Sequence, residues 1–203
     1  MKENPIRSLP GIPFLLGVLA ISALAAWLFI NGVIAAKQGA GGAPAMIIGG
    51  LLLGLVAFLS LIGLYTVQPN QAAVISLFGK YVGTVKENGL RWNNPFFSKK
   101  KISQRVRNFE SSKLKVNELD GSPIEIAAVI VWQVVDASEA VYNVDDYESF
   151  VHIQSESALR TMATSYPYDQ HEDGQVALRS HATEISQHLK DELAERLADA
   201  GVQ

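Results

Sequence analysis

The sequence predicts an α+β protein that begins with a helical hairpin in a membrane. Two uncharged apolar runs near the N-terminus predict the hairpin. Strand-like alternation followed by helical spacing predicts a mostly antiparallel sheet with helices, and the chain closes with an amphipathic helix. The 203 residues carry a formal net charge of −3 and no cysteine, which excludes disulfide scaffolds, thiolate metal sites and cysteine nucleophiles.

The membrane hairpin is predicted from the placement of charge. No charged residue lies between Arg7 and Lys37 or between Lys37 and Lys80. The apolar runs 12–36 and 45–67 fill these gaps, and each is long enough to cross the roughly 30 Å core of a bilayer as a helix. A short glycine-rich turn joins the two runs, so both ends of the hairpin are expected on the same side of the membrane.

Two other interpretations compete with a spanning hairpin. A signal peptide cleaved after Ala25 fits an Ala-x-Ala site, but the apolar run continues well past that residue. A re-entrant hairpin that enters and leaves one leaflet stays open. Lysine and arginine flank the outer ends of the hairpin, whereas only Lys37 lies in the turn. This asymmetry predicts a multi-pass membrane protein whose termini and soluble domain are cytoplasmic.

The second run contains a glycine pattern that is typical of packed membrane helices. Gly50 and Gly54 are four residues apart and therefore share one helix face, where a second backbone can approach closely. Glycine is also common in membrane helices for no specific purpose. If the pattern is specific, we expect the first helix of the hairpin to be its packing partner.

Beyond Pro69 the period of the sequence changes to that of strands. Residues 72–78 and 81–85 are expected to form a β-hairpin around Phe78-Gly79, and 102–109 is expected to be one further strand. Residues 123–135 are apolar on both faces. Such a run predicts a central strand that is covered on both sides.

After Asp136 the spacing of apolar residues becomes helical. Asp145-Asp146 is expected to cap a helix over 147–165, which the polar stretch 169–174 separates from a second helix over about 176–200. The second helix carries one apolar stripe, which suits a partner helix or the face of a sheet.

Charge is segregated along the soluble part. Residues 69–107 carry a net charge of +7, and residues 108–203 carry −12. The basic segment directly follows the membrane hairpin, and anionic headgroups attract each lysine or arginine near the surface by about 1 kcal/mol. A solvated loop at 98–101 is the plainer interpretation, and the acidic balance makes nucleic acid a poor partner. The residues predicted to contact the membrane surface are Lys80, Lys86, Arg91, Lys99, Lys100 and Lys101.

No catalytic motif appears in the sequence. His181, Glu184 and His188 fall on one helical face at a spacing that a metal could accept, but such sets arise easily by chance. The carboxylate pairs Asp145-Asp146 and Glu172-Asp173 are explained by helix capping and by a solvated loop. We therefore expect no enzymatic activity, no cofactor and no metal.

Short motifs spread over about half of the chain resemble the SPFH domain, also called the band 7 or stomatin/prohibitin family. No single motif is specific, but their order is. They are Val67-Gln-Pro69, Ala73-Val74-Ile75, Phe78-Gly79-Lys80-Tyr81, Gly89-Leu90-Arg91-Trp92 with Pro95-Phe96, Lys115-Val116-Asn117, Asp120-Gly121-Ser122-Pro123-Ile124, Val131-Trp132-Gln133-Val134-Val135-Asp136, Ala140 through Tyr147, and Ala158-Leu159-Arg160.

The resemblance implies a division of the chain. Residues 1–11 would be a tail, 12–67 two transmembrane helices, 68–174 an SPFH domain and 175–203 an amphipathic helix. In the family a final strand begins near a Gly-Val pair such as Gly201-Val202, and a long coiled-coil follows. Neither is present here, so we expect the chain to be a fragment. Two full-length apolar runs also differ from the single span or shallow hairpin of many members.

The resemblance also implies a function. Family members are non-enzymatic membrane scaffolds that self-assemble into large homo-oligomers and organise membrane microdomains. The implied partners are membrane lipids, further copies of the chain, and a membrane protease or small membrane protein. A dedicated regulatory subunit of one membrane protease or channel is the alternative, and an enzyme with an unseen site is a weaker one.

Overall fold

The computed structural model describes residues 3–170 and 176–203. Its elements confirm the predicted α+β class, with two apolar helices first, antiparallel sheets next and a helix near the C-terminus. The chain divides into two compact units. The first unit is Asn4–Lys101, and the second contains Ile102–Gln203 together with Glu3.

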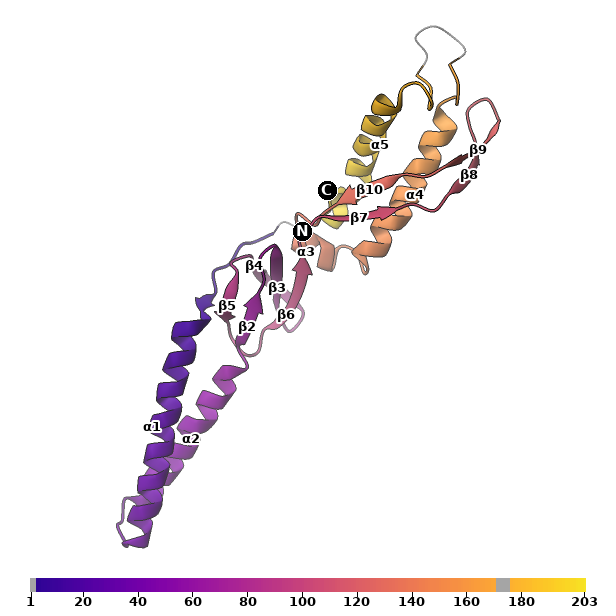
Figure 1. The fold of residues 1–203 in the computed structure, drawn as a ribbon. Coiled ribbons are helices and arrows are strands. Elements are labelled where there is room, and N and C mark those ends of the chain that lie inside the picture. The colour runs from indigo at the N-terminus through magenta and orange to yellow at the C-terminus, as the bar shows by residue number, and fades with distance from the viewer. Residues whose placement is uncertain (1–2, 171–175) are drawn as a thin grey trace. The chain divides into compact units, whose positions relative to one another are not determined.

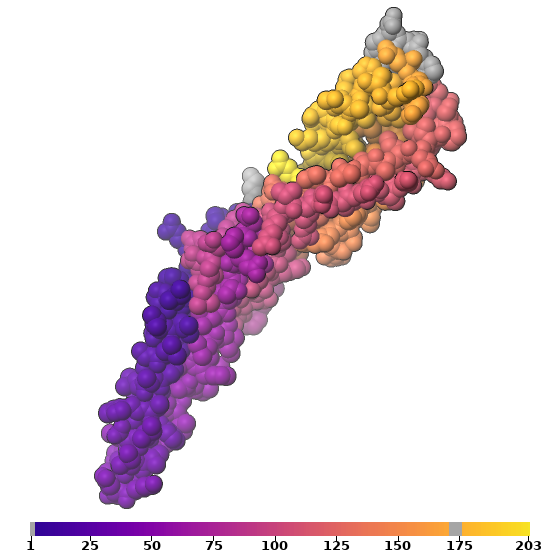
Figure 2. Space-filling view, viewed as in Figure 1, coloured from indigo at the N-terminus to yellow at the C-terminus, as the bar shows by residue number. Residues whose placement is uncertain are grey.

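The first unit contains the helical hairpin. Helix α1 spans Gly11–Lys37 and α2 spans Ala43–Leu61, and both are long and apolar enough to cross a membrane. The helices pack side by side along their length (Figures 1 and 2). Every buried residue of either helix is small or medium-sized and lies seven positions from the next, which gives each helix one narrow contact seam. These residues are Gly11, Val18, Ala25 and Gly32 in α1, and Ala43, Gly50 and Ala57 in α2.

The outer faces of both helices are apolar and uncovered by any described residue. Leu16 is 62% exposed, Trp27 60% and Phe58 65%. A core helix of a soluble protein would bury such side chains, because leaving them in water costs about 25 cal/mol per Å² of apolar surface. The exposed faces of the hairpin therefore suit a lipid environment.

The second apolar run was predicted to be helical as far as Val67, but the helix ends earlier. Helix α2 ends at Leu61, and Leu64–Val67 form strand β2. Gly63 explains the change, because a Cβ there would lie 2.2 Å from the carbonyl oxygen of Asn93, so only glycine permits this close backbone approach. The 19 residues of α2 still extend about 28 Å, close to the thickness of a bilayer core.

Two three-stranded sheets follow the hairpin in the first unit. One has the order β1–β5–β2, and the other has the order β4–β3–β6. The predicted hairpin at Phe78-Gly79 is confirmed, because β3 and β4 pair antiparallel and both turn residues have positive φ. The core of the unit gathers Tyr65, Val67, Ala73, Ile75 and Val85. The strand bounds are β1 Leu9–Pro10, β3 Gln71–Leu77, β4 Lys80–Val85, β5 Gly89–Trp92 and β6 Ser98–Ser103.

The chain on both sides of the membrane hairpin joins these sheets. Before α1, Leu9 pairs with Trp92 of β5, and Ile6 donates a backbone hydrogen bond of 3.0 Å to the carbonyl of Thr84 in β4. After α2, strand β2 pairs along the other edge of β5. The segments that enter and leave the hairpin therefore meet in one folded unit (Figure 1).

The strands of the second unit are shorter than predicted. The expected strand 102–109 is divided between β6 and β7 (Arg107–Glu110), and the expected strand 123–135 is divided into β9 (Pro123–Ile126) and β10 (Val129–Trp132). The division at 127–128 follows a change of partner. Strand β9 pairs with β8 (Leu114–Asn117), whereas β10 pairs with β7.

Strand β10 is also not covered on both faces. Ile130 and Trp132 are buried on one face, but Val129 is 65% and Val131 64% exposed on the other. The reason is that β10 belongs to a two-stranded sheet, and the described helices shield one of its faces only. An apolar run on both faces predicts a covered strand only when a layer of structure exists on each side.

The helices of the second unit follow local capping signals. Helix α4 spans Tyr147–Ser165 as predicted, and the carboxylate of Asp146 accepts hydrogen bonds from the first N–H groups, those of Glu148 (3.0 Å) and Ser149 (3.3 Å). Asp136 caps α3 (Ala137–Tyr142) in the same way, which was not predicted. Burial alone would raise the pKa of Asp136, but hydrogen bonds from Ser138 and Glu139 hold it below its ordinary value.

Helix α5 is shorter than predicted. It spans Ala182–Leu197 and continues as a short 3₁₀ turn over Ala198–Ala200. The residues from about 176 to 181, where the helix was predicted to begin, are not helical. The Leu178 amide instead donates a hydrogen bond to the Pro167 carbonyl (2.9 Å), in the segment that follows α4. The predicted break at 169–174 lies partly outside the described residues. Gly201, with φ +64, ends the turn, and Val202 then forms an antiparallel bridge with Val134.

Candidate functional site

The six predicted membrane-contact residues do not form one patch. Strand β4 begins at Lys80 and ends one residue before Lys86, so the two lysines lie about 20 Å apart at roughly 3.3 Å per residue. The Arg91 guanidinium lies 2.7 Å from the Glu87 carboxylate and also donates to the Asn88 carbonyl at 3.2 Å. The charge of Arg91 is therefore partly compensated within the protein.

Lys99 lies at the end of α2 and Lys101 against strand β2, while Lys100 is exposed and alternates with them along β6. The Lys99 ammonium donates to the Ile62 carbonyl at 3.4 Å, and the Lys101 ammonium donates to the Thr66 hydroxyl at 3.5 Å. Alternate residues of a strand share a face, which explains the division. Ile62 caps α2, so the Lys99 charge lies at the negative end of that helix dipole.

Partial burial at this position changes the acidity of two side chains. The Lys99 ammonium lies 5.3 Å from the centre of the Tyr65 ring, where it makes a cation–π contact. Burial lowers the pKa of Lys99, because it removes water from the charged form. Burial also raises the pKa of Tyr65, although hydrogen bonds from neighbouring side chains oppose that shift. Tyr65 therefore stays a neutral phenol at physiological pH.

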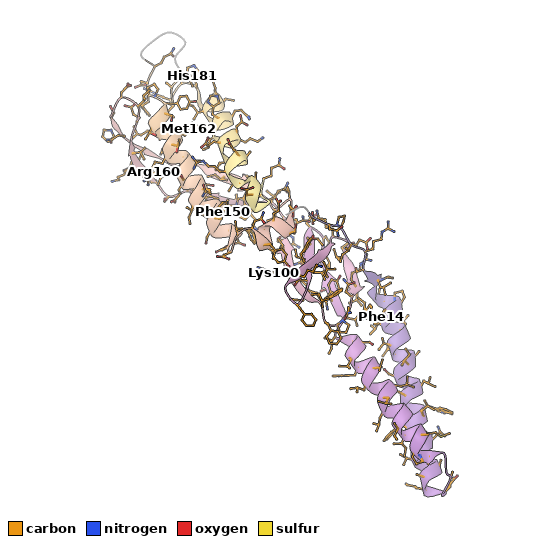
Figure 3. The ribbon with its side chains drawn as sticks, turned by 180° about the vertical axis from the view of Figure 1, so that it is seen from behind. Phe14, Lys100, Phe150, Arg160, Met162 and His181 are labelled. Atoms are coloured by element: carbon orange, nitrogen blue, oxygen red, sulfur yellow. The ribbon has the colours of Figure 1, made fainter. Side chains whose placement is uncertain are left out.

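Trp92 joins the sheet to both membrane helices. Its indole Nε1 donates to the Ser60 carbonyl near the end of α2 (2.8 Å), and its ring stacks on Phe14 near the start of α1 with 4.1 Å between ring centres. Figure 3 shows Phe14 at the end of α1 that adjoins the sheet. The sequence did not lead us to predict a site role for Trp92. Such a role could have been inferred from the enrichment of tryptophan where membrane helices meet water.

The two glycines of the predicted packing pattern have different surroundings. A Cβ on Gly50 would lie 2.8 Å from the Phe29 nitrogen and 2.9 Å from the Ala25 carbonyl oxygen, so the α1 backbone lies directly against it. A Cβ on Gly54 would meet only the Ala25 Cβ, at 4.0 Å. Gly50 is therefore one close contact point of the hairpin, and Gly54 is not sterically required there.

The candidate metal ligands serve structural hydrogen bonds. His181 Nδ1 lies 3.3 Å from the Ala177 amide that donates to it, and His188 Nδ1 lies 2.5 Å from the Tyr166 hydroxyl. Across residues 3–170 and 176–203, no group of three or more histidine, aspartate or glutamate side chains is arranged to hold a metal ion. The pair Glu172-Asp173 lies outside the described residues.

One buried carboxylate was missed by the sequence analysis. Glu118 is only 5% exposed and accepts hydrogen bonds from the amides of Asp120 (3.0 Å), Ser122 (3.1 Å) and Tyr168 (3.2 Å). These N–H donors, that of Asp120 first, lower the pKa of Glu118. The carboxylate thus fastens the β8–β9 turn to the segment after α4. Its backbone partners come from two segments far apart in the sequence, which explains how one side chain joins them.

Comparison with known proteins identifies one family and two relatives. The profile of the SPFH domain / Band 7 family matches residues 65–203. An uncharacterised protein of Methanothermobacter thermautotrophicus is 27% identical over 154 residues, which cover 75% of this chain and 47% of that protein. An uncharacterised protein of Methanocaldococcus jannaschii is 25% identical over 122 residues, 59% of this chain and 61% of its own. The chain thus spans about half to three fifths of these relatives.

Proposed function

The chain belongs to the SPFH domain / Band 7 family, and from this premise we propose that it is an integral membrane scaffold that self-assembles with further copies of itself. Members of this family are generally non-enzymatic scaffolds associated with membranes. We propose that the assembly organises lipids and partner proteins, with a membrane protease or a small membrane protein as the class of partner. The alternative is a regulatory subunit that is dedicated to one such partner.

The observation that carries the proposal is the return of both hairpin ends to one folded unit. Leu9 pairs with Trp92 before α1 begins, and β2 pairs with the same strand after α2 ends. A chain that crossed the membrane once would place these strands in different compartments. Cleavage after Ala25 would remove β1 and much of α1. The sheet therefore supports an uncleaved anchor whose two ends lie on one side, which we propose is the cytoplasmic side.

The test is the mass of the complex after extraction in a mild detergent. Light scattering coupled to size exclusion separates the protein mass from the detergent mass. A particle of many identical subunits is the expected result. A monomer or dimer would exclude a self-assembling scaffold. A particle containing one other membrane protein at equal stoichiometry would favour the dedicated regulatory subunit.

A further inference from the structure

One of the exposed aromatic rings of the first unit lies close to the end of α2. Phe96 is 72% exposed and lies in the loop Asn93–Phe97, between β5 and β6. Removing such a ring from water is favourable by about 25 cal/mol per Å² of apolar surface.

The loop holds Phe96 outward. The side chain of Asn94 accepts a hydrogen bond from the Phe96 amide, and the Asn94 carbonyl accepts one from the Phe97 amide, both at 3.0 Å. Phe97 packs against the core of the unit, whereas its neighbour Phe96 is exposed. The outward ring is thus a product of the turn and of the burial of Phe97.

The first residue of the loop and a residue of the strand that follows it are both attached to the residues that directly follow α2. The Asn93 amide donates to the Gly63 carbonyl at 3.1 Å, and the Lys99 ammonium donates to the Ile62 carbonyl at 3.4 Å. The spanning helix ends at Leu61. If α2 crosses a bilayer, the loop that carries Phe96 lies at the depth where that helix reaches the headgroups.

We propose that Phe96 inserts into the interfacial layer of the same bilayer that holds α1 and α2. The ring would lie between headgroups and acyl chains, where aromatic side chains are favoured. Lys100 is exposed near the loop and would add positive charge near anionic headgroups. The soluble part would then have its own lipid contact in addition to the hairpin. This inference rests on the proposed membrane anchor.

The absence of native cysteine allows a direct measurement of depth. Three single-cysteine variants, Phe96→Cys, Asn88→Cys and Phe58→Cys, are labelled with a small environment-sensitive fluorophore. Each is reconstituted into vesicles of phosphatidylcholine and phosphatidylglycerol. Asn88 is the matched control, because it is exposed and precedes the end of β5 that is remote from α2. Phe58, exposed on α2, reports on the hairpin itself.

The expected result is a different quencher for each position. Nitroxide near the lipid headgroup should quench the label at position 96, aqueous iodide should quench the label at 88, and nitroxide deep in the acyl chain should quench the label at 58. Iodide quenching at 96 equal to that at 88 would overturn the inference while the hairpin result stands. Protection from both iodide and lipid nitroxide would also overturn it, because protein would then cover Phe96. Iodide quenching at 58 would reject the membrane anchor itself.

Discussion

One close contact between the two apolar helices depends on the absence of a side chain at Gly50. Gly50 meets the α1 backbone at the separations described above, whereas Gly49 has no atom within 4 Å of its potential Cβ. The two neighbours therefore form a natural comparison, because the same substitution has a steric consequence at only one of them. Helix propensity and added apolar volume are the same for both.

We predict that Gly50→Val destabilises the hairpin by about 1–3 kcal/mol, the usual cost of overpacking a close contact. Gly49→Val should be close to neutral. The measurement is the mole fraction of sodium dodecyl sulfate that unfolds each variant in mixed micelles, followed by circular dichroism. Equal midpoints for the two variants would show that the Gly50 contact does not hold the hairpin together.

A second prediction at this scale concerns Glu118. Its folded-state pKa is lowered, so the stabilisation is present above the unfolded pKa of about 4.3 and is lost as pH falls through the folded value. Glu118→Gln replaces an acceptor-only carboxylate with an amide whose NH₂ faces backbone N–H donors. We expect a melting temperature several degrees lower at neutral pH, and a difference that shrinks in acid.

Thermal unfolding in detergent at a series of pH values tests this prediction. Glu110→Gln is the control, because Glu110 is exposed on β7 and the same substitution there removes a charge without removing a buried acceptor. A loss for Glu118→Gln that persists unchanged below the unfolded pKa would indicate a packing effect and not the ionised carboxylate.

At the scale of elements, one of two adjacent aspartates caps helix α4. Only Asp146 receives the N–H groups of Glu148 and Ser149. We predict that Asp146→Ala lowers the helix content and the melting temperature, because the first amides of α4 lose their acceptor. Asp145→Ala should leave both unchanged. Circular dichroism and thermal unfolding of the two variants test this prediction. Equal losses of helix content and melting temperature would show that Asp146 alone is not the cap of α4.

Local signals predicted elements well where the determinants are close in sequence. Helix α4 was predicted to both ends, because a capping aspartate precedes it and a polar break with Pro167 follows it. The turn at Phe78-Gly79 was found for the same reason. By contrast, Tyr65, Thr66 and Val67 are apolar enough to continue a membrane helix. Only their pairing with β5, much later in the chain, makes them a strand.

The site residues show the same limit. Composition identified a basic segment, but it gave no information on which charges meet. Lys99 and Lys101 donate to Ile62 and Thr66 from the same side of β6, because Lys100 alternates with them. The Arg91 guanidinium pairs with the Glu87 carboxylate. The roles of Trp92 and Glu118 depend on backbone groups that lie far away in sequence, at Ser60 and Tyr168. Periodicity does not report such pairs.

At the scale of the whole molecule, the hairpin topology can be tested with one label. We predict that Gly41→Cys, in the turn between α1 and α2, reacts with a membrane-impermeant maleimide from the side opposite to Asn88→Cys. Gly41 has open space around its potential Cβ, so the variant should fold. Labelling is compared in sealed vesicles of known orientation before and after permeabilisation. Reaction of both cysteines from the same side would establish a re-entrant hairpin.

The pairing of Leu9 with Trp92 across the membrane hairpin has a consequence for biogenesis. Strand β1 is synthesised first, yet its partner emerges only after both helices have left the ribosome. The sheet can close only if the insertion machinery returns the chain to its starting compartment. A chain with only one helix inserted would leave β1 and β5 on opposite sides of the membrane. The unpaired edges of these strands would then be exposed to proteolysis. If the hairpin spans the bilayer, this sheet can form only in chains whose two helices have both inserted.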